Sequence, residues 1–222
     1  MKYLPLYFLF LIFGTCFGQS SELDFKTYFT ENEIKDLNTI ADFFQSELCG
    51  TKDRKEFGKC IRDLVPKIVD LERTYIPKNI NYRKQKKLYR TISKNTFNKI
   101  WGLCKTWRTN EPKYEYESLC FSSDPDFINF VLDLGKTSGY LSRYAGILEL
   151  GGLGNSNFIA SNILEFPKSM NIDDRGVQVV FAIHYLTRND NLKRDKKAIR
   201  LENRDLIKLN RKIKKKTVPN NG

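Results

Sequence analysis

Carboxylates are the side chains of this sequence that could carry out acid–base chemistry unaided. Glycoside hydrolysis, for example, needs only two carboxyl groups at a fixed separation. Glu33, Asp124 and Asp173, however, stand where predicted helices begin, and there a carboxylate accepts hydrogen bonds from backbone N–H groups. A carboxylate-dependent hydrolase is therefore an alternative to a non-catalytic protein. The acidic residues considered for such a pair are Glu33, Glu47, Asp124, Asp126, Asp173 and Asp174.

Other catalytic chemistry has less support in the sequence. His184 is the only histidine, and it lies in an apolar segment where a structural histidine is the common case. Neither Gly-x-Ser-x-Gly nor His-Glu-x-x-His occurs. The glycine-rich run 151–154 lacks the last glycine of a dinucleotide fingerprint, because that position is Asn157. We interpret the run as a helix-ending turn and predict no catalytic residue, no metal site and no cofactor.

Four cysteines lie beyond the N-terminal leader: Cys49, Cys60, Cys104 and Cys120. An even number in an exported chain indicates two disulfides. Of the three possible pairings we favour the local one, Cys49 with Cys60 and Cys104 with Cys120. Four buried free thiols are the alternative. A zinc site is not favoured, because no Cys-x-x-Cys occurs.

Two basic blocks are the strongest functional signal. Residues 78–99 hold eight basic residues and no acid, and residues 193–216 hold twelve basic residues and three acids. The blocks contribute +8 and +9, whereas the chain after residue 18 has a net charge of +11, so the remainder carries −6. A mildly acidic body with two basic blocks predicts oriented binding of an anionic partner.

The expected partners of these blocks follow from the compartment. Tyr82, Tyr89 and Phe97 interleave with the charges and could stack on bases, but export argues against intracellular nucleic acid. The partners that remain are an anionic envelope surface, an anionic polysaccharide or an acidic protein face. The alternative is a solvated helix face with its aromatic rings turned into the core. The candidate anion-binding residues are Arg83, Lys84, Lys86, Lys87 and Arg90 in the first block and Arg204, Lys208, Arg211 and Lys212 in the second.

The leader indicates export. Lys2 is followed by an apolar run over 4–17 that closes in small and polar residues, as in a secretory signal peptide. The run is shorter than the roughly 20 residues of a membrane span. We expect residues 1–18 to be removed and the mature protein to be periplasmic or extracellular in a bacterium. Lipid attachment at Cys16 and an uncleaved interfacial anchor are the alternatives.

Helices are the elements expected to position these residues. Thr30 and Glu33 have the spacing of a capping box. Apolar residues then recur at intervals of three and four residues up to Leu48, which predicts an amphipathic helix. Gly50 can end this helix in a left-handed conformation.

Helical patterns continue through residues 19–192. One or two helices are predicted across 82–107, and a polar loop follows at 110–116. The apolar segment 177–186 fits a buried helix or a buried strand, and we assign it to a helix because its neighbours have helical patterns. The expected fold class is all-α, a single bundle-like domain of about seven or eight helices with a possible lobe boundary near 110–124.

The C-terminal residues 193–222 are expected to form a basic amphipathic helix that frays from about residue 214. Apolar residues recur every seven positions, but the companion heptad positions are mostly charged, so a coiled coil is not favoured. We expect a monomer. The predicted function is non-catalytic binding of an anionic partner or surface through 78–99 and 193–216. The alternatives are the carboxylate-dependent hydrolase and a structural or inhibitory protein that binds another protein.

Overall fold

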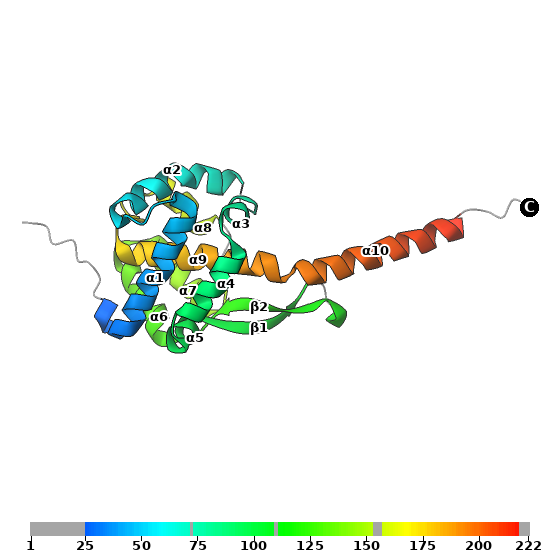
Figure 1. Cartoon of the computed structure of the whole chain (residues 1–222), viewed down its shortest axis with the longest axis horizontal. Helices are drawn as coiled ribbons and strands as arrows, with labels where there is room; N and C mark the ends of the chain where they lie inside the picture. The colour runs from blue at the N-terminus through cyan, green and yellow to red at the C-terminus, as the bar shows by residue number, and fades with distance from the viewer. Residues whose placement is uncertain (1–24, 72, 109–110, 153–156, 218–222) are drawn as a thin grey trace, which may run out of the picture.

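The structure, a computed structural model, describes residues 25–71, 73–108, 111–152 and 157–217. The predicted signal peptide and the alternative lipid attachment at Cys16 lie outside these residues. The described chain is predominantly helical, with helices packed around a common core and one two-stranded hairpin beside them (Figure 1).

The helices and strands have the following bounds. The helices are α1 Glu31–Cys49, α2 Phe57–Asp70, α3 Tyr75–Asn79, α4 Tyr82–Thr91, α5 Lys94–Ile100, α6 Pro125–Leu134, α7 Gly139–Glu149, α8 Phe158–Glu165, α9 Arg175–Arg194 and α10 Lys196–Thr217. The strands are β1 Trp101–Trp107 and β2 Glu115–Phe121. Short 3-10 turns occupy Phe25–Thr27, Arg54–Glu56, Pro112–Tyr114 and Gly135–Thr137.

Helix α9 lies at the centre of the core. Every residue from Gly176 to Thr187 is buried, and α1, α3, α4, α6 and β2 all pack against it. A helix covered on all sides needs no polar stripe, which explains why the segment 177–186 showed no periodicity. Its prediction as a helix is confirmed.

Several buried polar side chains of α9 form hydrogen bonds with neighbouring elements, as most buried polar groups do. Trp101 Nε1, at the start of β1, donates to Thr187 Oγ1 at 2.8 Å. Asn189 Nδ2 donates to Gln85 Oε1 of α4 at 2.6 Å. Gln85 Nε2 in turn donates to the Leu186 carbonyl at 2.7 Å. These bonds fix β1 and α4 in register with α9.

Local signals at the ends of several helices are confirmed. Thr30 and Glu33 form both hydrogen bonds of the capping box at the start of α1. Gly50 follows α1 with φ +66°, a conformation that glycine adopts without strain. Asp124 accepts from the backbone N–H groups of Asp126 and Phe127 at the start of α6.

The all-α prediction is wrong for residues 101–121, which contain an antiparallel hairpin. Trp101 stands opposite Phe121, and Trp107 stands opposite Glu115. In β1 only Trp101 is buried, because the strand projects away from the core. A strand buried at one end shows no alternation, and the spacing of Ile100, Cys104 and Trp107 imitated a helix. The helices are also more numerous and shorter than expected, since α3, α4 and α5 divide 75–100.

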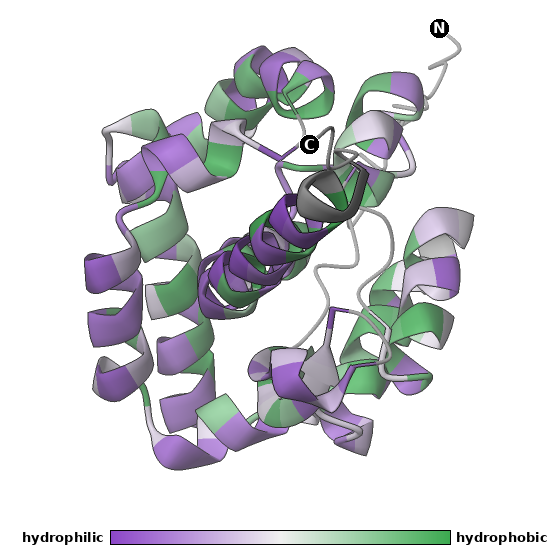
Figure 2. Ribbon diagram, turned by 90° about the vertical axis from the view of Figure 1, so that its right-hand side faces the viewer, coloured by the Kyte–Doolittle hydropathy of each residue, from purple (hydrophilic) through white to green (hydrophobic). Residues whose placement is uncertain are grey.

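The C-terminal segment contains a single helix, α10, over residues 196–217. The predicted fraying from about residue 214 stays a prediction. Helix α10 follows α9 after Asp195 and extends away from the body, pointing toward the viewer in Figure 2. Residues 218–222 lie outside the described chain.

The cysteines pair locally, as favoured from the sequence. Cys49 and Cys60 form one disulfide with a Cα–Cα distance of 6.0 Å, and Cys104 and Cys120 form the other at 5.9 Å. Both distances lie in the usual disulfide range. The first bond joins the end of α1 to α2, and the second joins the two strands of the hairpin.

We expect native protein to contain no free thiol at these four positions. Mass spectrometry of non-reduced peptides should recover Cys49 with Cys60 and Cys104 with Cys120. Replacing Cys104 and Cys120 together by Ser should lower the free energy of unfolding by about 3 kcal/mol, the loss expected for a loop of this size. Four alkylatable thiols in the native protein would contradict the pairing.

His184 has a structural environment. Its side chain is fully buried, and a hydrogen bond of 2.9 Å joins its Nδ1 to the Tyr144 hydroxyl of α7. Its ring also makes edge contacts with Tyr144 and Tyr185. It lines none of the surface depressions described below.

We predict that His184→Gln lowers the free energy of unfolding by about 1–3 kcal/mol, because a buried hydrogen-bonded group is disturbed. Chemical denaturation would measure the change, with the exposed substitution Lys168→Gln as a control that stays within about 0.5 kcal/mol. Binding to the vesicles described under Proposed function should be unchanged below the unfolding temperature. A loss of binding at unchanged stability would contradict the structural role.

Candidate functional site

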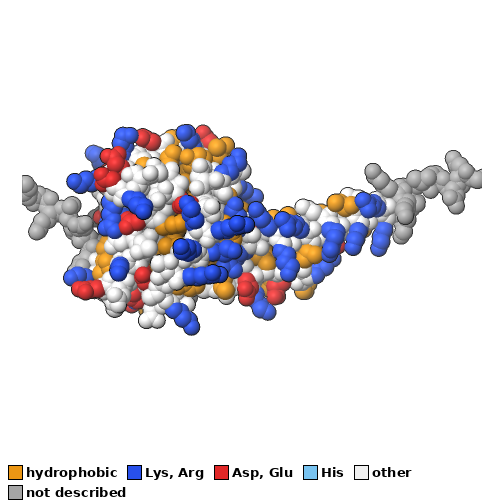
Figure 3. Space-filling model, viewed as in Figure 1, with side chains coloured by type: hydrophobic (Ala, Val, Ile, Leu, Met, Phe, Trp, Pro, Cys, Tyr) orange, Lys and Arg blue, Asp and Glu red, His pale blue; other side chains and the backbone are white. Residues whose placement is uncertain are grey.

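The exposed face of α4 is the most concentrated group of cations in the first basic block. Asn81 caps the helix by accepting from the N–H groups of Arg83 and Lys84. Gln85 and Leu88 are buried on the inner face. The helical period then places the remaining cations on the outer face, and Figure 3 shows them gathered over α4. These exposed residues are Arg83, Lys84, Lys86, Lys87 and Arg90.

The charge of α4 is only partly neutralised. Lys84 Nζ lies 2.8 Å from Glu47 Oε1 of α1, and Glu47 Oε2 accepts from the Asn81 backbone N–H at 3.1 Å. No carboxylate of the described residues lies within ion-pair distance of Arg83, Lys86, Lys87 or Arg90. The first turn of α4 also contains Arg83 and Lys84 and no acid. The helix dipole favours acids at this end of a helix and cations at the other end.

Two of the three aromatic residues of this block, Tyr89 and Phe97, pack against the core. Tyr89, Phe97 and Trp101 contact one another with ring centroids 5.3–5.6 Å apart. Burial is the main cause that raises the pKa of the Tyr89 hydroxyl well above its ordinary value. The alternative of aromatic rings turned into the core describes Tyr89 and Phe97, whereas Tyr82 is half-buried outside the core, with Lys86 Nζ 5.2 Å from its ring centroid.

Lys99 belongs to the fold and not to the basic surface. Its Nζ lies 2.8 Å from Asp126 Oδ2 and 3.3 Å from Glu33 Oε1, and the side chain is only 15% exposed. This pair of contacts ties α5 to α1 and α6. The first basic block is thus divided between a structural lysine and an exposed cationic helix face.

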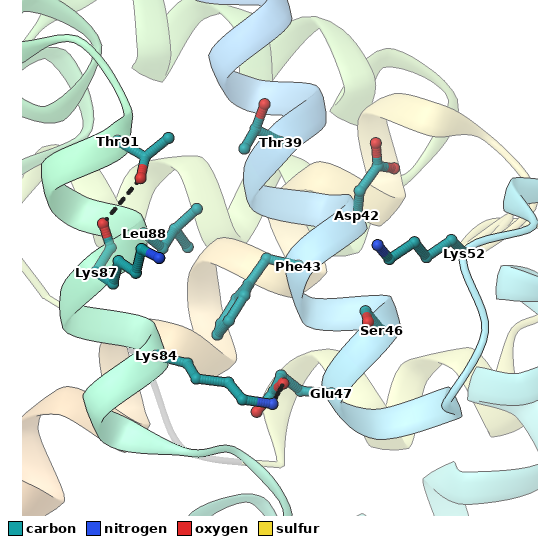
Figure 4. A pocket seen from close by; sticks show the side chains of 10 residues that line it. All are labelled: Thr39, Asp42, Phe43, Ser46, Glu47, Lys52, Lys84, Lys87, Leu88 and Thr91. Carbon is teal, nitrogen blue, oxygen red and sulfur yellow. Dashed lines mark hydrogen bonds and ion pairs between the residues drawn. The ribbon is translucent and has the colours of Figure 1, made fainter.

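A groove of about 630 Å³ separates α4 from α1. Phe43 and Leu88 provide its apolar part, and Lys84, Lys87 and Lys52 extend toward it from its sides (Figure 4). Asp42 and Glu47 also line it, but both are engaged by basic side chains. Thr39, Ser46 and Thr91 complete the lining.

Asp42 is held as a carboxylate by two arginines. Arg54 Nη2 donates to Asp42 Oδ2 and Arg175 Nη2 donates to Asp42 Oδ1, each at 2.6 Å. Burial alone would raise the pKa of Asp42, but the hydrogen bonds from Arg54 and Arg175 outweigh it, and the pKa is lowered. A general acid in glycoside hydrolysis needs the opposite shift.

The carboxylates considered for catalysis are likewise engaged in caps and ion pairs. Asp126 binds Lys99, and Asp173 lies 2.8 Å from Arg62 Nη1. The capping role expected of Asp173 belongs to Asp174, which accepts from the N–H groups of Gly176 and Val177 at the start of α9. Both residues precede the apolar segment, so the sequence alone could not separate them.

The hairpin braces the second basic block. Arg108 lies 3.2 Å from Asp195 Oδ2 and 2.7 Å from Glu202 Oε2. One turn further along α10, Asp205 accepts from the Tyr114 hydroxyl at 3.0 Å and pairs with Lys113 at 3.2 Å. The three acids of the block therefore point to the hairpin.

Beyond these contacts α10 has two opposed faces. Leu206, Leu209 and Ile213 share one face and are each about half-exposed. The helical period of 100° per residue puts the basic residues on the opposite face, where they line a shallow surface of about 430 Å³ with Asn203 and Ile207. These basic residues are Arg200, Arg204, Lys208 and Arg211. Lys212 is also exposed, at the edge of this face.

The two basic blocks meet where α9 passes into α10. Lys78 and Arg83 of the first block and Lys193 and Lys196 of the second line one depression of about 720 Å³. We call this depression the junction site. Figure 3 shows the Lys and Arg side chains continuing from α4 onto α10 on one face of the molecule. The two blocks are visible in the sequence. Their proximity is not, because it depends on how α3 and α4 pack against α9.

Comparisons with known proteins give no further guide to function. No protein-family model matches the sequence, no curated protein matches it, and no solved structure matches the fold. Within the described residues, no helix has both the length and the apolar character needed to cross a membrane. In the same part of the chain, no group of three or more His, Cys, Asp or Glu residues is placed to hold a metal ion.

The lowered pKa of Asp42 predicts a pH-dependent contribution to stability. A carboxyl whose pKa is lower in the folded protein stabilises it fully above its unfolded pKa, about 3.9, and loses this effect as pH falls through the folded pKa. Asp42→Asn should therefore destabilise the protein by about 1–3 kcal/mol at pH 7. The difference from wild type should narrow below about pH 4.

Urea unfolding between pH 2.5 and 7 would measure this difference. Asp63→Asn is the matched control, because its ion pair with Lys59 is largely exposed and should contribute little to stability at any pH. If the free energies of unfolding of wild type and Asp42→Asn differed by the same amount at every pH from 2.5 to 7, the lowered pKa of Asp42 would be contradicted.

Proposed function

We propose that this protein is an exported, non-catalytic protein that binds an anionic envelope surface through α4 and α10. One observation carries the proposal: cations without carboxylate partners form one continuous face from α4 across the junction site to α10. Many acids of the described body are meanwhile engaged in caps and ion pairs, and among the described residues Lys84 is the one exposed cation of α4 with a carboxylate within ion-pair distance. Such separation of charge gives attraction that is oriented as well as strong.

The two-faced character of α10 supports a lipid surface over a soluble polyanion. A helix with a basic face and an apolar face lies at the boundary between lipid headgroups and acyl chains. Leu206, Leu209 and Ile213 are about half-exposed to solvent and would be covered there. A polysaccharide or an acidic protein face would bind the basic residues but would leave these apolar side chains exposed to water.

Two further observations support export and the absence of catalysis. Two disulfides are typical of proteins that work in an oxidising compartment. Each carboxylate considered for a hydrolase is engaged in a cap or an ion pair, and the pKa of Asp42 in the α1–α4 groove is lowered instead of raised. A hydrolase would need one carboxyl with a raised pKa facing a cleft.

The test is co-sedimentation with vesicles of anionic or neutral lipid. We compare wild type with Arg204→Gln/Lys208→Gln/Arg211→Gln, which removes three charges from the basic face of α10. Since each such residue near an anionic membrane is worth about 1 kcal/mol, binding to anionic vesicles should fall at least about tenfold. Added salt should release the wild type, because screening shortens the range of attraction to below about 8 Å.

The matched control is Lys35→Gln/Lys67→Gln/Lys168→Gln, which removes the same charge from exposed positions on other parts of the body. This control should bind nearly as wild type does. A second variant ends the chain after Asp205, so that the ion pairs to the hairpin are kept. Equal binding of the wild type to neutral and anionic vesicles would contradict the proposal. It would also be contradicted if Arg204→Gln/Lys208→Gln/Arg211→Gln and the matched control lost the same fraction of vesicle binding. Retention on an anionic polysaccharide with no vesicle binding would favour the polysaccharide.

A further inference from the structure

The junction site is distinct in kind from the rest of the basic surface because it is concave and its cations come from four elements. Lys78 is in α3, Arg83 in the first turn of α4, Lys193 in the last turn of α9 and Lys196 at the start of α10. Lys78 and Arg83 precede Lys193 and Lys196 by more than a hundred residues in the chain, so the cluster exists only in the folded protein. Its other lining residues are Pro77, Asn79, Ile80, Asn81 and Tyr82.

No acid lines the junction site. None of its nine lining residues is Asp or Glu, and none of the four cations has a carboxylate of the described residues within ion-pair distance. Like charges gathered without a counter-charge repel one another. Folding therefore maintains a local concentration of positive charge that an anion would relieve.

Lys193 is the least solvated of the four cations. Its side chain is partly buried, and its Nζ donates to the Pro77 carbonyl at 3.1 Å. Burial lowers the pKa of Lys193, and the charge of Lys196 lowers it further. An ammonium group has three donors, so the contact with Pro77 holds Lys193 in place and leaves donors for a ligand.

Most backbone N–H groups near the site already have partners within the chain. The N–H groups of Arg83 and Lys84 already donate to Asn81 Oδ1, and Asn79 Nδ2 donates to the Tyr75 carbonyl. An anion would thus be held by one guanidinium and three ammonium groups. A guanidinium fork matches two oxygens of a phosphate, and lysines add point charges to the others.

We propose that the junction site binds a phosphate-type oxyanion, held by Lys78, Arg83, Lys193 and Lys196. The inference rests on the proposed anion-binding function. It adds to that function a class of ligand, phosphate, and the site that binds it, the junction site. Phosphate suits the site better than a lone carboxylate does, because its charge approaches −2 near neutral pH and its oxygens point in several directions. The depression is larger than one phosphate, so the group could belong to a lipid headgroup or to a soluble phosphate.

The test is calorimetric titration of the full protein with inorganic phosphate at constant ionic strength. Wild type should bind one phosphate per chain saturably, and Arg83→Gln/Lys196→Gln should weaken binding at least about tenfold through the loss of charge-assisted hydrogen bonds. The matched control is Arg143→Gln/Lys168→Gln, which removes the same side-chain types from exposed positions outside both basic blocks and should weaken binding less than about twofold. All four residues are exposed, and circular dichroism would verify that both variants fold.

Absence of saturable phosphate binding would overturn the inference, and so would equal weakening in the two double variants. A second arm identifies the source of the phosphate by using vesicles with phosphomonoester or phosphodiester headgroups at equal surface charge. A preference for the monoester that Arg83→Gln/Lys196→Gln removes supports the site with a lipid headgroup as its source. Saturable binding of phosphate without such a preference supports the site with a soluble phosphate as its source.

The inference and the proposed function can fail separately. The calorimetric titration contains no vesicle, so it does not depend on α10 reaching a membrane. Loss of vesicle binding in every assay with intact phosphate binding would overturn the surface function alone. Vesicle binding that depends on α10, with no phosphate binding, would overturn the junction site alone.

Discussion

The burial of α9 is the constraint on which the rest of the structure depends. A twenty-residue helix that is covered on nearly all sides can pack in only one register if it carries polar side chains at Thr187 and Asn189 that need specific partners. Those partners come from β1 and α4, so the position of the hairpin and of the cationic helix follows from the bonds made by α9. The same helix leads into α10 after Asp195. Its packing in the core therefore also sets the direction in which α10 leaves the body.

Acids and bases have different roles in this molecule. Asp42, Glu47 and Asp126 hold helices together by pairing with arginines and lysines inside the body. Apart from Lys84, the exposed cations of α4 and α10 have no such partners among the described residues and can meet an external anion. The net charge of +12 does not show this arrangement, because it does not say which charges are paired and which are exposed without a partner. Electrostatic attraction of an external partner depends on what remains exposed.

Sequence reasoning succeeded where the signal is local. The capping box at Thr30, the glycine after α1 and the N-cap at Asp124 each depend on residues within a few positions. It failed for β1, because a strand that is buried only at Trp101 carries no alternating pattern. The basic blocks were visible as composition, but the split between Lys99 and the exposed face of α4 was not. Likewise, the junction site joins residues more than a hundred positions apart, and only tertiary packing brings them together.

The short spacing of the paired cysteines has a consequence for the order of folding. The partners are 11 and 16 residues apart, whereas any other pairing would close loops of roughly 45 to 70 residues. Loop closure costs about 1 kcal/mol more for each of those longer loops, so in an unfolded chain the correct thiols meet several times more often than incorrect ones. The covalent framework can therefore form before the distant helices dock, and oxidation need not wait for, or be corrected by, the assembled core.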